Sequence, residues 1–319
     1  MSIRPYQPST DVDAVVALWN VCFPVPFHLG RRLFEQNTTG DPHFDENGAF
    51  VLDIDGHVRG YLGCKKARAP LGSLGLLPDR GWISVLFVHP SVRRQGHGKA
   101  LMAAGRRWIE GRQLYLGGDP AHFFPGVPDG FESALRFFAA EGFRFGDGKA
   151  WDLRQDIRAW QPPRDVEALE AQAGVSIGSC QSSWTADLLE FFDREFPGRW
   201  KHDTRRRLAL EPGPEDVVVA RTDDGRIEGF SSTWQPASRT LGPSVYWLGS
   251  ACGGLGPIGV SSSMRGKGLG LALVYRSTMH VKANGAEHMG VDWTVLLDFY
   301  RKAGFEPWLC YRLAAPAGG

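Results

Sequence analysis

Two short glycine-containing loops carry the residues best suited to chemistry in this sequence. The segments Arg93-x-x-Gly96-x-Gly98 and Arg265-x-x-Gly268-x-Gly270 each stand between an apolar run and a helical pattern. The first turn of a helix has unpaired N–H groups and about half a positive charge, so it attracts an anion, and glycine lets a phosphate approach the backbone. The arginine adds a charge-assisted hydrogen bond. Each loop therefore predicts a phosphate site.

Two nucleotide-binding motifs compete for these loops, and neither fits. A P-loop requires G-x-x-x-x-G-K-[ST], but Ser261 stands in place of the first glycine and Gly268 follows Lys267. The dinucleotide fingerprint G-x-G-x-x-G is absent from both loops. A pair of ordinary glycine-rich connections remains an alternative, although it does not explain why the arginine recurs.

The elements that must position the loops recur with them. Self-similarity in a constant order indicates a duplicated domain. The matching segments, first copy and then second, are Ser2-Ile3 with Ser176-Ile177, Val88 to Gly98 with Val260 to Gly270, and Phe137 to Phe143 with Phe299 to Phe305.

The length of 319 residues fits two domains of ordinary size. Adjacent prolines at Pro162-Pro163 interrupt helices and strands, so we expect one domain at 1–160, a linker at 161–174 and a second domain at 175–319. A short helix from Asp165 to Gln172 is expected within the linker.

Each copy shows helical and strand patterns in the same order, which predicts an α/β fold with a mixed sheet. An amphipathic helix precedes a hairpin, and an apolar strand then leads through the glycine loop to a helix, another strand, a further helix and a closing strand. The expected segments, first copy and then second, are the helices Val12 to Cys22 and Ala186 to Phe192, the turns Asp55-Gly56 and Asp224-Gly225, and the strands Ile83 to Val88 with Leu255 to Val260 and Gln113 to Leu116 with His288 to Asp292.

Composition excludes several classes of partner. Lysine and arginine total 36 against 35 acidic residues, and this balance offers no field for nucleic acid or an anionic membrane. Five cysteines without a C-x-x-C pair suggest reduced thiols, and no apolar stretch predicts a signal peptide or a membrane span. We expect a cytoplasmic protein without nucleic-acid or membrane partners.

The duplicated loop resembles the [QR]-x-x-G-x-[GA] signature of the GNAT superfamily, the acyl-CoA-dependent N-acyltransferases. Both copies match it, and the strand before each loop and the F-[FY]-x-x-x-G-F endings match as well. The resemblance covers most of each half, and it implies two tandem GNAT-fold domains related by duplication.

By this resemblance, the Arg265 to Gly270 loop cradles the coenzyme A pyrophosphate. Backbone groups at Gly259 and Val260 then face the pantetheine and polarise the acyl carbonyl as a fixed N–H donor does. The glycines and proline of Gly256 to Gly259 fit a bulge or a close backbone approach, with a simple bend as the alternative. The donor-site residues implied in the second copy are Ile258, Gly259, Val260, Arg265, Gly266, Lys267, Gly268, Leu269 and Gly270, and in the first copy Phe87, Val88, Arg93, Arg94, Gln95, Gly96, His97 and Gly98.

Acyl transfer to an amine also needs an acid and a base. GNAT enzymes often use a tyrosine on the helix after the fifth strand as the acid, and Tyr300 occupies that position, with a packing role as the alternative. Phe138 stands there in the first copy and has no ionisable proton, so the resemblance implies a catalytically degenerate first domain and a catalytic second one.

Asp292-Trp293 lies where the fifth strand should end, at the edge where open α/β sheets place ligands. Asp292 there can hold the substrate ammonium or act as base through water, and Trp293 can stack on a ring; a turn aspartate is the alternative. His288 and Glu228 are weaker candidates. The loop from His122 to Pro128 is expected to form a lid or wall of the acceptor pocket.

Together these features predict an N-acetyltransferase that moves an acetyl group from acetyl-CoA to the primary amine of a small molecule such as an amino sugar, without a metal. The chain resembles bacterial amino-sugar acetyltransferases and, more distantly, the two-domain mycothiol synthase type, which acetylates a cysteinyl amine. The competing hypothesis is a regulatory protein that binds acyl-CoA without turnover.

Overall fold

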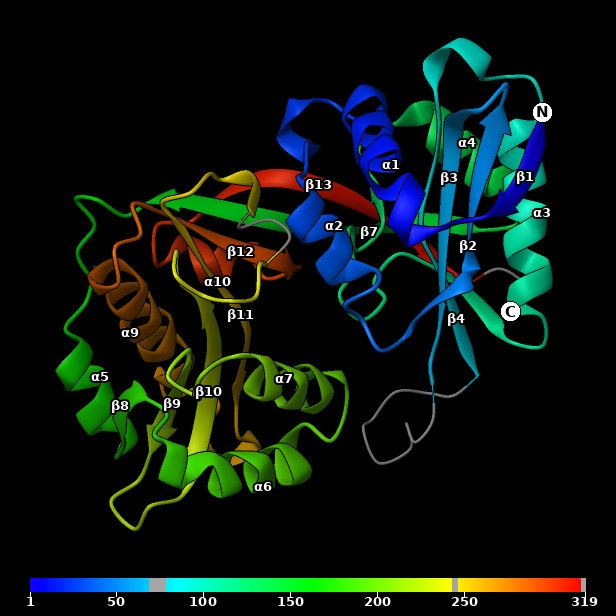
Figure 1. Cartoon of the computed structure of the whole chain (residues 1–319). Helices are drawn as coiled ribbons and strands as arrows, with labels where there is room; N and C mark the ends of the chain where they lie inside the picture. The colour runs from blue at the N-terminus through cyan, green and yellow to red at the C-terminus, as the bar shows by residue number, and fades with distance from the viewer. Residues whose placement is uncertain (69–78, 243–245, 317–319) are drawn as a thin grey trace. The chain divides into compact units, whose positions relative to one another are not determined.

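The computed structural model describes residues 1–68, 79–242 and 246–316, which form two compact units (Figure 1). Of these residues, unit 1 contains 1–68, 79–150 and 310–316, and unit 2 contains 151–242 and 246–309. Within the described ranges, no helix is long and apolar enough to cross a lipid bilayer.

Unit 1 is built on a five-stranded sheet. Asp55 and Gly56 have φ values of 53° and 77°, which confirms the predicted tight turn of its central hairpin. The first four strands pair antiparallel, and the last pair is parallel, as a strand–helix–strand connection requires. In spatial order the strands are β1 (Ser2–Pro5), β2 (Phe44–Ile54), β3 (His57–Lys66), β4 (Arg80–Val88) and β5 (Gln113–Leu116).

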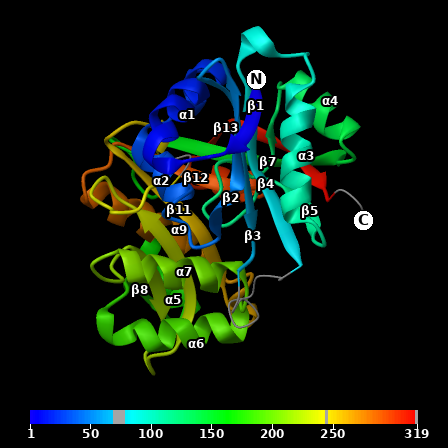
Figure 2. The same cartoon turned by 45° about the vertical axis from the view of Figure 1, so that its right-hand side comes forward.

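Helices cover both faces of this sheet (Figure 2). Leu101, Met102 and Ile109 form the apolar stripe of α3, and they pack with Leu62 and Ile83 of the sheet. The opposite face is covered by α1, which buries Val15 and Trp19 among other residues. The helices of the unit are α1 (Pro8–Cys22), α2 (Arg31–Asn37), α3 (His97–Ile109) and α4 (Glu132–Ala140).

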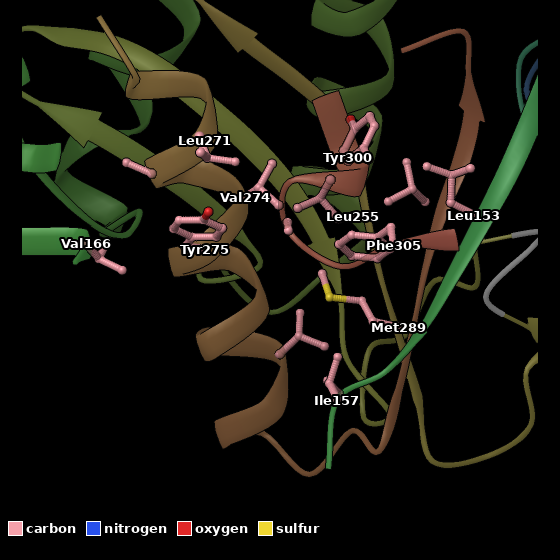
Figure 3. Close-up of a cluster of buried hydrophobic side chains, with 14 of the residues drawn as sticks. Leu153, Ile157, Val166, Leu255, Leu271, Val274, Tyr275, Met289, Tyr300 and Phe305 are labelled. Carbon is pink, nitrogen blue, oxygen red and sulfur yellow. The ribbon is translucent and has the colours of Figure 1, made fainter. Parts of the chain in front are cut away.

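Unit 2 repeats this plan. Phe191 and Phe192 of α6 pack on Phe230 at one face of the sheet, while α9 packs on the other face against Leu255 and Met289 (Figure 3). The strands are β8 (Ser176–Ser179), β9 (Val217–Arg221), β10 (Ile227–Trp234), β11 (Cys252–Val260) and β12 (His288–Thr294), and the helices are α6 (Thr185–Glu195), α7 (Arg199–Leu210), α9 (Leu269–Ala283) and α10 (Leu297–Arg301).

The closing strands do not stay within their own sequence copies. In β7 (Arg144–Asp156), residues 151–156 belong to unit 2 and pair antiparallel with β12. In β13 (Glu306–Ala315), the part from Cys310 belongs to unit 1, where it pairs with β6 (Val127–Pro128). The prediction that each copy is completed by its own last strand is therefore wrong, because a repeat in sequence does not reveal which copy a strand pairs with.

The short helix expected near residue 165 is present as α5 (Val166–Ala173). Asp165 caps its first turn by accepting the Ala168 N–H, and Gly174 ends it at φ 65°. Glu170 then pairs with Arg276 of α9 at 2.6 Å. This segment is consequently part of the packed structure of unit 2.

The basic run Arg205-Arg206-Arg207 has acidic neighbours at Asp203 and Glu211, a pattern typical of a solvated helix face. It lies on helix α7, but part of it is buried. Arg207 is buried, pairs with Asp216 at 2.8 Å and lies 4.5 Å from the centre of the Trp234 ring. A guanidinium can be buried when an opposite charge and an aromatic face replace its hydration.

Candidate active site

The two glycine loops have the same backbone conformation. Gly96 has φ 85° and ψ −7°, and Gly268 has φ 84° and ψ −8°. This left-handed conformation costs a residue with a Cβ roughly 1–2 kcal/mol, so both positions require glycine. Each glycine is the N-cap of the following helix, and the loops therefore present the first-turn N–H groups of α3 and α9 alike.

The second glycine of each loop lies next to an aromatic ring. A Cβ at Gly98 would lie 3.3 Å from the Phe137 ring, and a Cβ at Gly270 would lie 3.4 Å from the Phe299 ring. The contact at Gly98 would be tight, whereas the separation at Gly270 is an ordinary van der Waals distance.

The loop side chains differ in their access to solvent. Arg93 and Arg265 are exposed, and the Arg93 Nε donates to the Val88 carbonyl at 2.8 Å. His97 and Leu269 are buried, so only their backbone N–H groups can face a bound phosphate. The remaining exposed loop residues are Arg94, Gln95, Gly96, Gly266 and Lys267.

In unit 1 the parallel strands part at the loop. The β4–β5 register runs from Arg80↔Gln113 to Ile83↔Leu116, while β4 continues to Val88. A cavity of about 700 Å³ lies beside this continuation, a size typical of cofactor sites. Its lining includes Ser84 to Val88, Arg93, Arg94, Gly96 to Lys99, Phe137 and Phe138.

The strands part at the same place in unit 2. The β11–β12 register runs from Cys252↔His288 to Leu255↔Val291, and β11 continues to Val260. Gly259 has a packing reason, because its Cβ would lie 2.7 Å from the rings of Phe196 and Phe230. Ile258 and Val260 are half-buried next to it.

Aromatic rings fill the α1 side of unit 1. Trp19 stacks on Phe124, with ring centres 5.5 Å apart, and contacts Phe87 of β4 at 5.4 Å. Phe34 of α2 stacks on Phe123 at 5.7 Å. Phe123 and Phe124 belong to the segment predicted to form a lid or wall, and here they are buried in the core of unit 1. An acceptor on this side would have to displace packed rings.

A buried ionic cluster fixes the same segment. Lys65 lies 2.6 Å from Asp41 and 2.8 Å from Asp119, and Ser84 donates a hydrogen bond to Asp119. Burial raises the pKa of Asp119, but the Lys65 ammonium and hydrogen bonds outweigh it and hold the pKa below its usual range. His122 is buried near this carboxylate and contributes to the lowering of its pKa. The cluster was not predicted, because its members are far apart in sequence.

Tyr300 of α10 lies in the core of unit 2 beside Leu255 and Phe305 (Figure 3). Its side chain is 4% exposed, and burial raises the pKa of its hydroxyl well above the usual value, so the phenol is protonated at neutral pH. Phe138 in α4 is 6% exposed. Both copies thus pack a ring at this position, and only the second carries a hydroxyl group.

The end of β12 departs from regular pairing. Val291 pairs with Leu153 and Thr294 pairs with Trp151, so Asp292 and Trp293 form an irregular step between them. The Trp293 N–H donates to Asp152 at 3.0 Å, and Asp152 is a buried residue that sequence reasoning missed. A Cβ at Gly256 would lie 3.9 Å from the Asp292 carbonyl, which places the step beside the parting strands.

The two weaker candidates lie elsewhere in unit 2. His288 begins β12, at the opposite end from Asp292, and lines a separate cavity of about 640 Å³ with Arg154 and Trp308. Glu228 is buried in β10 and pairs with Arg226 at 2.9 Å.

A glycine loop at a helix start, beside parallel strands that part, defines an acyltransferase of the GNAT fold, and this chain contains the arrangement twice. The acetyltransferase (GNAT) family profile matches residues 12–124 and again 185–305. The chain therefore belongs to the GNAT family and is an acyltransferase with two tandem GNAT folds, as predicted. The family uses acetyl-CoA and acts on small-molecule amines.

Curated relatives are mycothiol acetyltransferases. The chain is 25% identical to that of Saccharomonospora viridis over 86% of this chain and 89% of the relative. It is 26% identical to that of Salinispora arenicola over 88% of this chain and 85% of the relative. The resemblance to the mycothiol synthase type thus extends over both copies.

Solved structures show the same tandem fold. A glucosamine N-acetyltransferase region of a fungal multi-domain GH3 beta-N-acetylglucosaminidase superposes with a TM-score of 0.88 at 26% identity, over 98% of this chain and 38% of that one. A GCN5-related N-acetyltransferase from Sphaerobacter thermophilus gives a TM-score of 0.73 at 18% identity, over 99% and 95% of the two chains. A tandem GNAT protein from the clavulanic acid biosynthesis pathway gives 0.67 at 19% identity, over 100% and 99%.

Proposed function

We propose that this chain transfers the acetyl group of acetyl-CoA to the primary amine of an amino sugar, and that unit 2 carries out the reaction. The observation behind this proposal is the end of β12, where Asp292 and Trp293 lie beside the parting of β11 and β12. A carboxylate next to an indole suits an ammonium group on a ring with an apolar face.

In the proposed complex, the pyrophosphate binds the first turn of α9 and Arg265. The pantetheine lies along β11 from Gly256 to Val260, where pairing with β12 has ended. A backbone N–H of this segment polarises the thioester carbonyl. The loop and cavity of the first copy offer an equivalent donor site at Phe87, Val88 and residues 93–98.

The acceptor amine arrives protonated, and Asp292 accepts its proton directly or through water. The neutral nitrogen then attacks the thioester carbonyl and forms the new C–N bond. Collapse of the tetrahedral intermediate breaks the C–S bond, and Tyr300 gives its proton to the departing thiolate. The extra proton on the new amide nitrogen returns to the Tyr300 oxygen, and Asp292 releases its proton to solvent. No metal takes part in this sequence.

We assign no turnover to the first copy. Phe138 cannot deliver a proton, and packed rings occupy the α1 side of unit 1, where an acceptor would approach β4. Unit 1 then acts as an acyl-CoA-binding unit beside the catalytic unit 2 in the same chain.

Two comparisons support the class of acceptor. The fungal region that superposes at 0.88 is named a glucosamine N-acetyltransferase, and the curated relatives are named mycothiol acetyltransferases. Glucosamine and a cysteinyl amine are accordingly the first acceptors to test.

The test is release of the coenzyme A thiol from acetyl-CoA by the full chain, with glucosamine, galactosamine, S-methylcysteine and lysine as acceptors. We expect turnover with an amino sugar and a loss of at least ~100-fold in Asp292→Asn, the size of a general base contribution. Binding of acetyl-CoA without thiol release for any amine would favour the regulatory hypothesis. Release with S-methylcysteine alone would move the acceptor to the cysteinyl class.

A further inference from the structure

We propose that Asp152 is a positioning residue, which holds Trp293 in a left-handed backbone conformation so that its indole forms the stacking surface for the acceptor ring beside Asp292. This inference rests on the proposed function and adds to it the residue that builds the acceptor surface. Asp152 lies on β7, about 140 residues before Trp293 in the sequence.

The backbone at Trp293 is one that a bulky residue rarely adopts, with a φ of 46°. The first copy shows what the fold requires here. Leu116 and Val291 hold corresponding places, because each ends its parallel register, so Gly118 corresponds to Trp293. Gly118 also has a positive φ, of 66°. Both copies therefore have a left-handed residue at this position, although in the first copy Gly117 before it is left-handed as well, and only the second copy places a large side chain there.

The surroundings explain why the conformation persists. Trp293 lies between two fixed pairs, Val291↔Leu153 and Thr294↔Trp151, and Asp152 is the residue of β7 between them. Asp152 is 1% exposed and accepts the Trp293 N–H at 3.0 Å. Strain of this kind is retained where neighbouring structure over-determines it, and it is concentrated at functional sites.

The exposed surface indicates the ligand. Trp293 is 39% exposed, and Val295 and Leu296 after it are more exposed still. Large apolar side chains grouped at a strand end beside Asp292 fit a ligand that has both a C–H-rich face and a cation. An amino sugar in its pyranose form has both, since one ring face presents C–H bonds and the amine is protonated.

The first experiment compares Trp293→Gly with Trp293→Ala, which remove the same indole. Alanine is normally the more stable residue of the two, but at a positive φ the order reverses. We expect the thermal midpoint of Trp293→Gly to lie above that of Trp293→Ala. The matched control is Asp55→Gly, at an exposed hairpin residue with φ 53°. It places glycine at a positive φ without removing an indole, so the KM for the acceptor should not change.

The same variants report on the acceptor. Loss of the ring should raise the KM for glucosamine about tenfold, the size of one stacking contact, and leave the KM for acetyl-CoA unchanged, whereas Trp293→Phe should retain most of the affinity. Equal glucosamine KM values in Trp293→Ala and the parent, or a higher midpoint for alanine than for glycine, would overturn the inference.

The second experiment separates positioning from bulk stability. Asp152→Asn keeps an oxygen that can accept the Trp293 N–H, and Asp152→Ala does not. We expect the asparagine variant to stay near the parent and the alanine variant to raise the glucosamine KM about tenfold, with kcat and the acetyl-CoA KM within about twofold. Equal glucosamine KM values in the two variants would contradict a positioning role.

Calorimetric titration of glucosamine into the coenzyme A-saturated chain distinguishes the two proposals. One outcome is that the parent binds glucosamine without turning it over and Trp293→Ala binds it more weakly. This outcome would refute the proposed function and support the stacking surface. Neither binding nor turnover of glucosamine in the parent would refute both.

Discussion

Tyr300→Phe tests the assignment of the proton donor with little disturbance of the fold. The first copy already has phenylalanine at this position, and Phe138 is as buried as Tyr300, so the ring alone satisfies the packing. Loss of the hydroxyl should cost at most about 1 kcal/mol of stability, which corresponds to a fall of a few degrees in Tm for a unit of this size. Loss of general acid catalysis should lower kcat by ~100- to 10,000-fold.

The assay is steady-state thiol release with acetyl-CoA and an amino sugar, together with a pre-steady-state trace. The KM for acetyl-CoA should not change, because only the donor proton is removed. Tyr275→Phe is the matched control: Tyr275 is fully buried in the same core, its hydroxyl donates to the Lys302 carbonyl at 3.2 Å, and its loss should leave kcat within about twofold.

The pH profile gives an independent reading. Burial raises the pKa of Tyr300, so the acid stays protonated beyond the usual tyrosine range near 10 and should cause no fall in kcat below that pH. A Tyr300→Phe variant that keeps kcat within twofold, and shows no burst of thiol release in either protein, would return Tyr300 to a packing role. A burst would show that product release limits kcat, and the burst rates of the parent and the variant would then be compared in place of kcat.

Three further predictions follow from the loops, a half-buried histidine and the exchanged strands. Arg265→Ala should weaken coenzyme A binding to the second copy roughly 10- to 150-fold, as expected for one charge-assisted hydrogen bond, and calorimetry showing the parent's affinity in a folded variant would remove the pyrophosphate assignment. Burial lowers the pKa of His280, so the folded state favours the neutral imidazole. The free energy of unfolding should therefore fall as the pH drops below about 6.5 and through the folded-state pKa. When the free energy is measured by denaturant titration at a series of pH values, His280→Gln should make this fall shallower, and an unchanged pH dependence would contradict the prediction. A chain of residues 164–319 lacks the part of β7 that pairs with β12, so it should elute as aggregate in gel filtration because a strand edge and Met289 are uncovered; a soluble, active monomer would contradict this.

Much of the local structure was predictable from the sequence. The Asp55-Gly56 turn, the strand from Gln113 to Leu116 and the left-handed glycines of both loops follow from short-range backbone sterics, which nearby residues decide. Helix α2 was missed, and for α7 only its basic run was expected to be helical. Arg207 was expected on the solvated face of its helix but is buried, because it forms an ion pair with Asp216 and contacts the Trp234 ring.

One glycine has a packing reason that the motif does not reveal. Gly259 was predicted to face a cofactor, and its missing Cβ also makes room for the rings of Phe196 and Phe230. A glycine in a sequence signals a close approach without saying which partner approaches.

The sequence by itself determined the family, the duplication and the loops, because these depend on residue types at fixed short spacings. It also determined that only the second copy has a hydroxyl at the position shared by Phe138 and Tyr300. The tertiary structure decided which copy each closing strand pairs with, how packed rings fill the α1 side of unit 1, and that Asp152 holds Trp293. These features arise from contacts between residues far apart in the chain, where pairing and packing in three dimensions, and not spacing, set the partner.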